Sequence, residues 1–315
     1  MIRYIVKRLL ALIPVVLGLI IVVFTIMHFA PGDPTTTILG SEYSVEASIQ
    51  LKKELGLDKP LVVQCFNYII NLVRGDFGKS YVSREPVIKQ LSTRFPHTLK
   101  LMLASMFFCL VIALPIGIYS GSKPNTLFSN ITMIIAFLGV SLPVFWTGLL
   151  LILLFSVFLG WLPSGGIDRG IVSLILPAIA LGSSYMANTM RTTRSSMLEC
   201  VRQDYVRTAR AKGVSERNVI FSHALPNALM PTVTVVGMSV GYLLGGSVVT
   251  ETVFSIPGTG RMLVESIGKR DIPSVLGCLV VLALCMAAAN LIVDIVYAYL
   301  DPRIKAQYKS GRVGT

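Results

Sequence analysis

The sequence predicts an all-α, polytopic membrane protein with six transmembrane helices, and three observations lead to that prediction. Hydrophobic residues make up 53% of the 315-residue chain and charged residues 14%, and the mean hydropathy is +0.72. A soluble domain carries about 25% charged residues, so this chain has too few to cover a water-facing surface. Long uncharged runs alternate with charged links, and the basic residues gather in every second link.

Six runs without Asp, Glu, Lys or Arg are each long enough to cross a bilayer as a helix, which takes about 20 residues. They cover 9–32, 101–122, 124–167, 170–190, 218–250 and 272–293. A helix satisfies its own backbone groups in lipid. The third run exceeds what one crossing needs, and we expect its helix to be broken or tilted around Ser141-Leu142-Pro143, because proline interrupts a helix.

Basic residues fix the expected orientation. The net charge is +3 before the first run, +1 at Lys123, +4 over 191–217 and +3 over 301–315. Such links lie in the cytoplasm. Six crossings place all four on that side, whereas a seventh crossing in the third run would separate the last two. We therefore expect a plasma-membrane protein with both termini cytoplasmic, and we assign its net charge of +12 to this bias, not to nucleic-acid binding.

The chain is expected to divide into three parts. Segment 1–32 holds the cytoplasmic N-terminus and the first helix, 33–100 forms a small helical cap on the outer side, and 101–315 forms a five-helix core. In the cap, Ser44 is expected to N-cap a helix that runs through Leu55 and stops at Gly56. A second cap helix is expected to start at Pro60 and run to Arg74.

The most charged part of the core is the cytoplasmic loop 191–226. Residues 197–212 have a helical composition, and Gly213 is a natural helix stop. Ser215 can N-cap a second short helix that leads to Leu225-Pro226. The sequence therefore predicts a protruding elbow that docks to a cytoplasmic partner.

Glycines in the fifth run indicate close helix packing. Gly237, Gly241 and Gly245 are four residues apart, so they share one helix face that a second helix can approach closely. Packing within the chain and a subunit interface both remain open. Leu243 lies on the other side of the helix, two residues beyond Gly241. We expect Leu243 to face lipid or a looser contact.

No catalytic or metal site is evident. Gly78-Lys79-Ser80 resembles the end of a phosphate-binding loop, but Val73 stands where the first glycine belongs, and no strand is predicted before it. The histidines lack metal-ligand spacing, and no two cysteines share an aqueous compartment, so neither a metal nor a disulfide is expected. The histidines are His28, His97 and His223; the cysteines are Cys65, Cys109, Cys200, Cys278 and Cys285.

The elbow resembles the coupling loop of permease subunits of ATP-binding-cassette importers, which has the form E-A-A-x-x-x-G followed by I-x-L-P. Ala209, Gly213, Leu225 and Pro226 match this pattern. Arg207, Thr208 and His223 depart from it. The whole string at 204–213 is similar to the variant of the dipeptide, oligopeptide and nickel branch.

Further strings along the chain resemble the same branch, in order. They are Pro31-Gly32-Asp33-Pro34, Gly56-Leu57-Asp58-Lys59-Pro60, Gly75-Asp76-Phe77-Gly78 with Ser80, Thr192 to Met197, Glu251 through Pro257-Gly258 to Gly260-Arg261, Arg270-Asp271 and Asp301-Pro302-Arg303. Because they cover nearly the whole chain, they indicate the family far better than the elbow alone.

The resemblance implies a type I importer permease fold and a non-catalytic subunit that forms half of a translocation pathway. It implies four partners besides lipid: a homologous second permease, two cytoplasmic ATPases and an extracytoplasmic binding protein. The chain itself would bind no cofactor, while the ATPases would use ATP and Mg. The residues implied in coupling are Asp204, Tyr205, Arg207, Ala209, Arg210, Lys212, Gly213, Leu225 and Pro226. Ala209 and Gly213 are expected to form a small docking face rimmed by basic residues.

Two alternatives to a peptide importer remain open. The same branch also carries nickel chelates and glutathione on similar permeases, although we favour peptides as the substrate. An ion-coupled secondary transporter would need a coupling site at mid-membrane. Asp294 is the only acid within a run and lies near its cytoplasmic end, where pairing with an arginine is the favoured interpretation.

Overall fold

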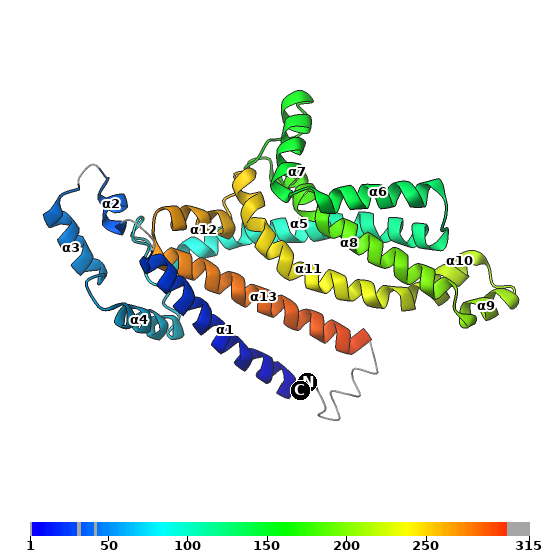
Figure 1. Ribbon diagram of the computed structural model, residues 1–315, viewed down its shortest axis with the longest axis horizontal. Helices are drawn as coiled ribbons and strands as arrows, with labels where there is room; N and C mark the ends of the chain where they lie inside the picture. Colours follow the sequence, from blue (N-terminus) through cyan, green and yellow to red (C-terminus); the bar gives the residue numbers. More distant parts are fainter. Residues whose placement is uncertain (1, 30–32, 41–42, 301–315) are drawn as a thin grey trace. The chain divides into compact units, whose positions relative to one another are not determined.

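The computed structural model describes residues 2–29, 33–40 and 43–300, and most of them are helical (Figure 1). Pro31-Gly32 and Asp301-Pro302-Arg303 lie outside the described residues. The first elements are α1 (Ile2–Phe29), α2 (Pro34–Leu39), α3 (Val45–Leu55), α4 (Leu61–Val73), α5 (Val87–Ser122), α6 (Leu127–Ser141), α7 (Val144–Leu151), the π-helix η2 (Ile152–Phe158) and the 3₁₀ helix η3 (Gly170–Leu174). There follow α8 (Ile175–Val201), α9 (Asp204–Ala211), α10 (Glu216–Asn218), the π-helix η4 (Val219–Ala224), α11 (Leu225–Val253), α12 (Thr259–Gly268) and α13 (Ile272–Leu300).

Five helical segments are long and apolar enough to cross a membrane, and a bent pair makes a sixth crossing if it counts as one span. The pair is 127–139 and 144–158, which meet at 106°. Helix α6 ends at Ser141 and α7 begins after Pro143, so the helix break expected at Ser141-Leu142-Pro143 is confirmed. Pro143 has no N–H to continue the ladder of α6 and fits the start of a new helix.

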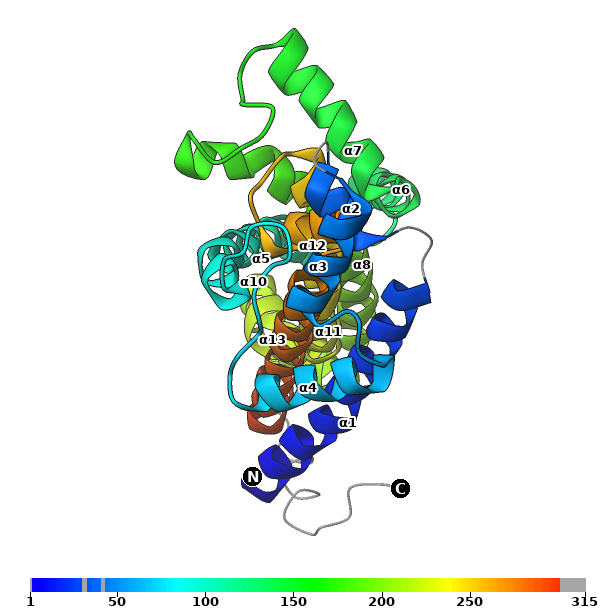
Figure 2. The ribbon, with the colours of Figure 1, turned by 90° about the vertical axis from the view of Figure 1, so that its left-hand side faces the viewer.

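The described chain separates into two compact units. The first unit joins Met1–Leu99 to Ser255–Ala287. Its core forms where Ile20 and Phe24 of α1 pack with Leu276 and Val280 of α13, and apolar residues of α4 cover this cluster. Helix α4 crosses α1 (Figure 2). This unit contains the segment that we predicted to be an outer cap.

The two cap helices begin and end where the sequence predicts. The Ser44 side chain accepts a hydrogen bond from the N–H of Ala47 at 3.1 Å, which caps α3. Gly56 ends α3 with a left-handed φ of 68°, a conformation that costs glycine little. Helix α4 follows Pro60 and has Arg74 as its C-cap.

The second unit joins Lys100–Phe254 to Ala288–Thr315 and is organised around α8. Helix α8 contacts α6, α7 and α11 (Figure 1), and α5 approaches it closely at two glycines. A Cβ placed on Gly117 of α5 would lie 2.7 Å from Cβ of Thr193, and one on Gly121 would lie 2.5 Å from Cβ of Met197. Only glycine allows α5 to approach α8 so closely.

The glycines of α11 do not share one environment. A Cβ on Gly237 would lie 2.2 Å from Cγ1 of Val293 on α13, whereas the position for a Cβ on Gly245 has no neighbouring atom within 4 Å. Gly241 is buried. Leu243 is only 1% exposed, so the expectation that it faces lipid or a loose contact was wrong. Helix α11 is covered on several sides, and residues on opposite faces are therefore both buried.

We expect leucine to be far more disruptive at Gly237 than at Gly245. The added side chain at Gly237 must displace Val293, and overpacking of this kind costs about 1–3 kcal/mol. The purified protein with Gly237→Leu should melt several degrees below the parent, while Gly245→Leu should melt near it. Equal melting temperatures for the two variants would contradict the close contact between α11 and α13.

Candidate functional site: the loop between α8 and α11 and a polar pocket

The loop between α8 and α11 folds as the short helix α9, a turn at Gly213, and α10 with η4. Helix α8 ends at Val201, so the single helix expected over 197–212 is interrupted at Arg202-Gln203 before α9 begins. Gly213 ends α9 with φ = 77°. Its N–H donates to the carbonyl of Arg210 at 3.0 Å, and the N–H of Val214 donates to that of Ala209 at 3.3 Å. The predicted glycine stop is confirmed, because this left-handed cap suits glycine.

The return into the membrane also follows the sequence closely. Ser215 is the N-cap of α10, although its side chain makes no capping hydrogen bond. The π-helix η4 then leads into α11, where Pro226 occupies the first turn. Proline is tolerated there because the N–H groups of a first turn have no helical partner.

A small apolar core holds this loop to the ends of the two long helices. Val206 and Ala209 of α9 pack with Met197 of α8, Val219 of η4 and Ala228 of α11. Ala209 is 6% exposed. It therefore packs inside the loop, and the expectation that it forms an outward docking face was wrong. A short surface helix has one face toward its neighbours, and the spacing of three residues from Val206 places Ala209 on that face.

An ion pair connects the two halves of the loop. Nε and Nη2 of Arg210 donate to the carboxylate oxygens of Glu216 at 3.0 and 2.7 Å. These hydrogen bonds raise the pKa of Arg210 and lower the pKa of Glu216. Because the pKa of Glu216 is lowered, the pair is complete at neutral pH and is lost only when acid protonates the carboxylate. Arg210 thus joins α9 to α10.

The outward face of the loop is polar. Asp204 and Arg207 approach each other at 4.0 Å with both side chains largely in solvent, and Lys212 and Gly213 are exposed. The Tyr205 hydroxyl accepts a hydrogen bond from Nδ2 of Asn227 at 3.1 Å, which ties α9 to the start of α11. Any partner that docks here meets Asp204, Arg207 and Lys212 on a surface supported by the core beneath.

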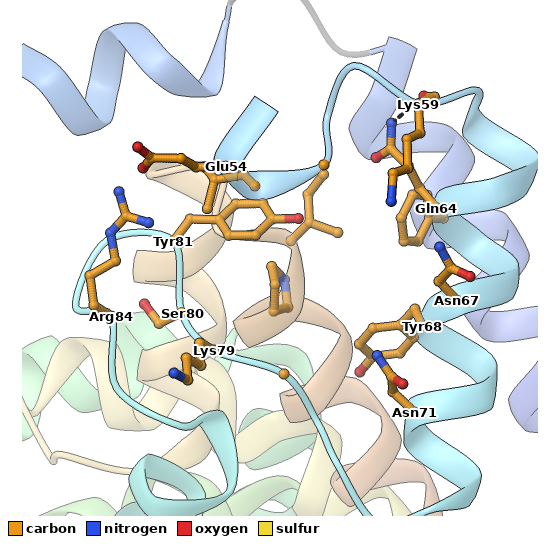
Figure 3. Close-up of a pocket in the computed structure, with 16 residues that line it drawn as sticks. Glu54, Lys59, Gln64, Asn67, Tyr68, Asn71, Lys79, Ser80, Tyr81 and Arg84 are labelled. Atoms are coloured by element: carbon orange, nitrogen blue, oxygen red, sulfur yellow. Dashed lines mark hydrogen bonds between the residues drawn. The ribbon is translucent and has the colours of Figure 1, made fainter. Parts of the chain in front are cut away.

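A polar pocket of about 390 Å³ lies in the first unit (Figure 3). One wall is α4, and the other consists of the end of α3 and the loop before α5. The α4 side carries Gln64, Asn67, Tyr68 and Asn71, with Lys59 just before the helix; Glu54, Lys79, Ser80, Tyr81 and Arg84 lie opposite. Three cations, one acid and several amides suit a ligand that bears a carboxylate and peptide groups.

Two tyrosines shape this pocket. The Tyr68 hydroxyl is buried and has no hydrogen-bond partner among the described residues, and burial raises its pKa. Burial, and next the carboxylate of Asp271, raise the pKa of Tyr81 to about 12. Both phenols are therefore protonated donors at neutral pH.

Asp271 fixes the loop that closes the pocket. Its carboxylate accepts hydrogen bonds from the Ser80 hydroxyl at 2.5 Å, the Tyr81 N–H at 2.9 Å and the Ser274 hydroxyl at 2.8 Å. The carboxylate is buried at the start of α13. Gly78-Lys79-Ser80 belongs to this tight loop, in which the Val87 N–H donates to the Gly78 carbonyl. The segment does not lead from a strand into a helix, as a nucleotide-binding loop would.

The described residues contain no group of three or more His, Cys, Asp or Glu that could hold a metal ion. All five cysteines are free thiols, two of them buried. Asp294 of α13 has an electrostatic or hydrogen-bonding partner.

The comparison with protein families decides what kind of protein carries this loop. Residues 113–306 match the family described as "Binding-protein-dependent transport system inner membrane component", and residues 1–102 match the N-terminal family of the same membrane components. The chain belongs to this family. It is a non-catalytic permease subunit of an ABC importer and a multi-pass protein of the inner membrane.

Curated relatives of this importer permease match over nearly their whole length. The dipeptide transport system permease protein DppB of Alkalihalophilus pseudofirmus is 42% identical over 97% of this chain and 100% of its own. The glutathione transport system permease proteins GsiC of Escherichia coli strain K12 and of Salmonella typhimurium are 43% identical, with 97% and 99% covered. These matches confirm the predicted dipeptide and glutathione branch.

A solved structure supports the fold. A chain of the MetNI methionine ABC transporter, in an inward-facing conformation, superposes with a TM-score of 0.55 at 21% identity. The match covers 69% of the importer permease and 99% of that chain. It confirms the type I importer permease fold that the resemblance implied.

Sequence reasoning missed the glycines that bring α5 against α8 in this permease. Gly117 and Gly121 are four apart, as are the glycines of α11, so the same spacing rule identifies them. The structure distinguishes the two sets by what each glycine touches. Because α8 continues into the loop that holds α9 and α10, the Gly117–Gly121 contact positions the helix that supports this loop.

Proposed function

We propose that this permease forms half of the translocation pathway of a peptide importer. A homologous second permease would supply the other half, two cytoplasmic ATPases would use ATP and Mg, and an extracytoplasmic binding protein would deliver the substrate. The main support for this proposal comes from the cytoplasmic loop, because it is compact, has its own core and continues directly into α8 and α11. A segment with such a core moves as one body when a partner pushes it.

Coupling would proceed through the outward face of the loop. Closure of the ATPases on ATP would press on α9, and the Met197–Val206–Val219 packing would pass the displacement to α8 and α11 together. The Arg210–Glu216 pair would keep α9 and α10 from separating during this step. The chain's own residues thus provide a lever, while the free energy comes from the partner ATPases.

Short peptides are the substrates that we favour. One set of relatives is named for dipeptide transport and another for glutathione transport, and dipeptides and glutathione alike carry amide bonds and free carboxylates. The pocket in the predicted cap has a lining that suits this chemistry. A nickel chelate remains the second candidate within the branch, and uptake experiments separate the two.

The proposal is tested by purifying the tagged permease from its own cells and measuring transport after reconstitution. Two ATPases, a second permease and ATP-dependent uptake of radiolabelled di- or tripeptide are expected when the neighbouring binding protein is supplied. A permease that purifies alone and transports with an ion gradient, or a complex that imports a nickel chelate and no peptide, would contradict it.

The orientation is a further expectation of this function, since the loop must face the cytoplasmic ATPases. We expect six crossings with both termini inside, because this arrangement gathers the basic links on one side. A cysteine introduced at Ser310, in a background without the native cysteines, should resist an impermeant maleimide in intact cells and react after permeabilisation. Labelling in intact cells would show that the tail lies outside.

A further inference from the structure

A groove of about 410 Å³ runs along the second unit between α8 and α11. Its lining comes from one face of each helix: Ser184, Tyr185, Asn188 and Arg191 of α8, and Val235, Met238, Ser239 and Tyr242 of α11. Within each helix these positions follow the spacing of three and four residues that marks one face. The two faces run antiparallel, so Tyr185 meets Tyr242 at one end and Arg191 lies toward Val235 at the other.

Polar and aromatic groups of this groove stand exposed on helices that cross the membrane. Tyr242 is 61% exposed and Met238 58%, and Arg191 is exposed as well. The Tyr185 and Tyr242 rings stack with centroids 6.3 Å apart. Within a bilayer, exposed hydroxyls and an amide are costly against lipid and typically face a water-filled path. Arg191 directly follows the uncharged run 170–190, so its guanidinium stands at the end of this path.

The groove has one charged end and no acid in its lining. Nη2 of Arg191 lies 3.5 Å from the Asn188 side-chain oxygen, a weak contact that leaves the other guanidinium donors available. The two serines already donate to carbonyl groups, Ser184 to Gly139 and Ser239 to Val235. Arg191, Asn188 and the tyrosine hydroxyls are thus the groups that can bind a ligand.

We propose that this groove is a substrate-binding site in the translocation pathway. It binds the C-terminal carboxylate of a short peptide at Arg191, and the peptide's backbone and side chain at Tyr185 and Tyr242. The proposal rests on the proposed function. A guanidinium holds a carboxylate in two parallel hydrogen bonds, and tyrosine rings offer an apolar face with a polar edge. Without an acid in the lining, the groove selects the carboxylate end and not the amino end.

The length of the groove agrees with a peptide of two or three residues. Tyr185 and Arg191 are six positions apart on a helix, about 9 Å along its axis. Two to three extended residues span about 7–11 Å. The volume lies within the range of roughly 300–1,000 Å³ that is common for small-molecule sites.

The test compares Arg191→Gln with Lys123→Gln, which removes the same charge outside the groove, from the turn between α5 and α6. Each reconstituted importer is assayed with a dipeptide and, separately, with the same dipeptide amidated at its C-terminus. The uptake of each compound is divided by the affinity of the binding protein for that compound, which is measured separately. The parent and Lys123→Gln should prefer the free acid equally. Arg191→Gln should reduce uptake of the free acid roughly ten- to hundredfold, as expected for the loss of a charge-assisted hydrogen bond. It should also lose most of the preference for the free acid over the amide. Arg191→Lys should recover part of it.

A second measurement does not depend on any variant. A photoreactive dipeptide, delivered to the parent importer during ATP turnover, should crosslink to Met238 or Tyr242. Crosslinks only to residues outside the groove would rule out a substrate-binding site there. So would an Arg191→Gln importer that prefers the free acid over the amide as strongly as the Lys123→Gln importer does. Either result would leave the proposed function intact. A parent importer that transports no peptide would instead overturn the proposed function.

Discussion

Replacing Gly121 by leucine is expected to remove most of the folded permease from the membrane. Even a Cβ at this position would lie 2.5 Å from Cβ of Met197 and 2.7 Å from the carbonyl oxygen of Arg194. The second atom belongs to the backbone of α8, so no side-chain rotation relieves the clash. Overpacking a tight contact by a methylene group or two costs about 1–3 kcal/mol, and leucine adds more and forces α5 away from α8.

The measurement is the yield of monodisperse permease after mild solubilisation, followed by its melting temperature. Gly18→Leu is the matched control, because Gly18 also lies in a long apolar helix but a Cβ there has no neighbour within 4 Å. We expect the control to resemble the parent and Gly121→Ala to fall between the two. A Gly121→Leu protein with parental yield and melting temperature would refute the close contact of α5 and α8.

Local features of this fold follow from the sequence because their causes are local. Ser44, Gly56 and Gly213 mark helix ends through their own hydrogen bonds and backbone angles, which depend on a few neighbouring residues. The break at Pro143 has the same origin. The charge-free runs predict the spans for an equally direct reason, since the length of an apolar helix needs no knowledge of its partners.

Features that depend on the packing of one helix against another could not be predicted from the sequence in this way. The glycines at 117 and 121 have the same spacing as those of α11, yet Gly121 touches the α8 backbone while Gly245 faces open space. The orientation of Ala209 was misjudged for a related reason. The family pattern marks a small residue, but whether it is small for a partner or for the loop's own core depends on how α9 packs against Met197 of α8 and Val219 of η4.

The groove illustrates the same limit at the proposed substrate site. Its residues come from α8 and α11, the two helices joined by the loop of α9 and α10, and none of them stands out in its own stretch of sequence. Arg191 alone satisfies the positive-inside rule. Only the packing of α8 against α11 brings Tyr242 to the face of α8 that carries Tyr185 and Arg191.

Proline at Gly213 is expected to abolish transport while leaving the permease inserted. Gly213 has φ = 77°, whereas proline is restricted to about −65°, and proline also lacks the N–H that donates to the Arg210 carbonyl at 3.0 Å. The turn between α9 and α10 cannot keep its shape with this residue. Because the loop lies outside the long helices, we expect near-parental amounts in the membrane but loss of ATP-dependent uptake and of its stimulation of ATP hydrolysis.

Gly213→Asn separates the shape of the turn from the identity of the residue. Asparagine enters the left-handed region more readily than other residues with a side chain, and a Cβ at Gly213 meets no atom within 4 Å. Its importer should therefore retain most uptake, while Gly213→Ala should fall between asparagine and proline. Uptake and stimulated ATP hydrolysis are measured on the same vesicles, with complex assembly checked by co-purification of the ATPases. If Gly213→Pro assembles and transports like the parent, the loop does not transmit the ATPase stroke through this turn, and the lever proposed for α8 and α11 must lie elsewhere in the chain.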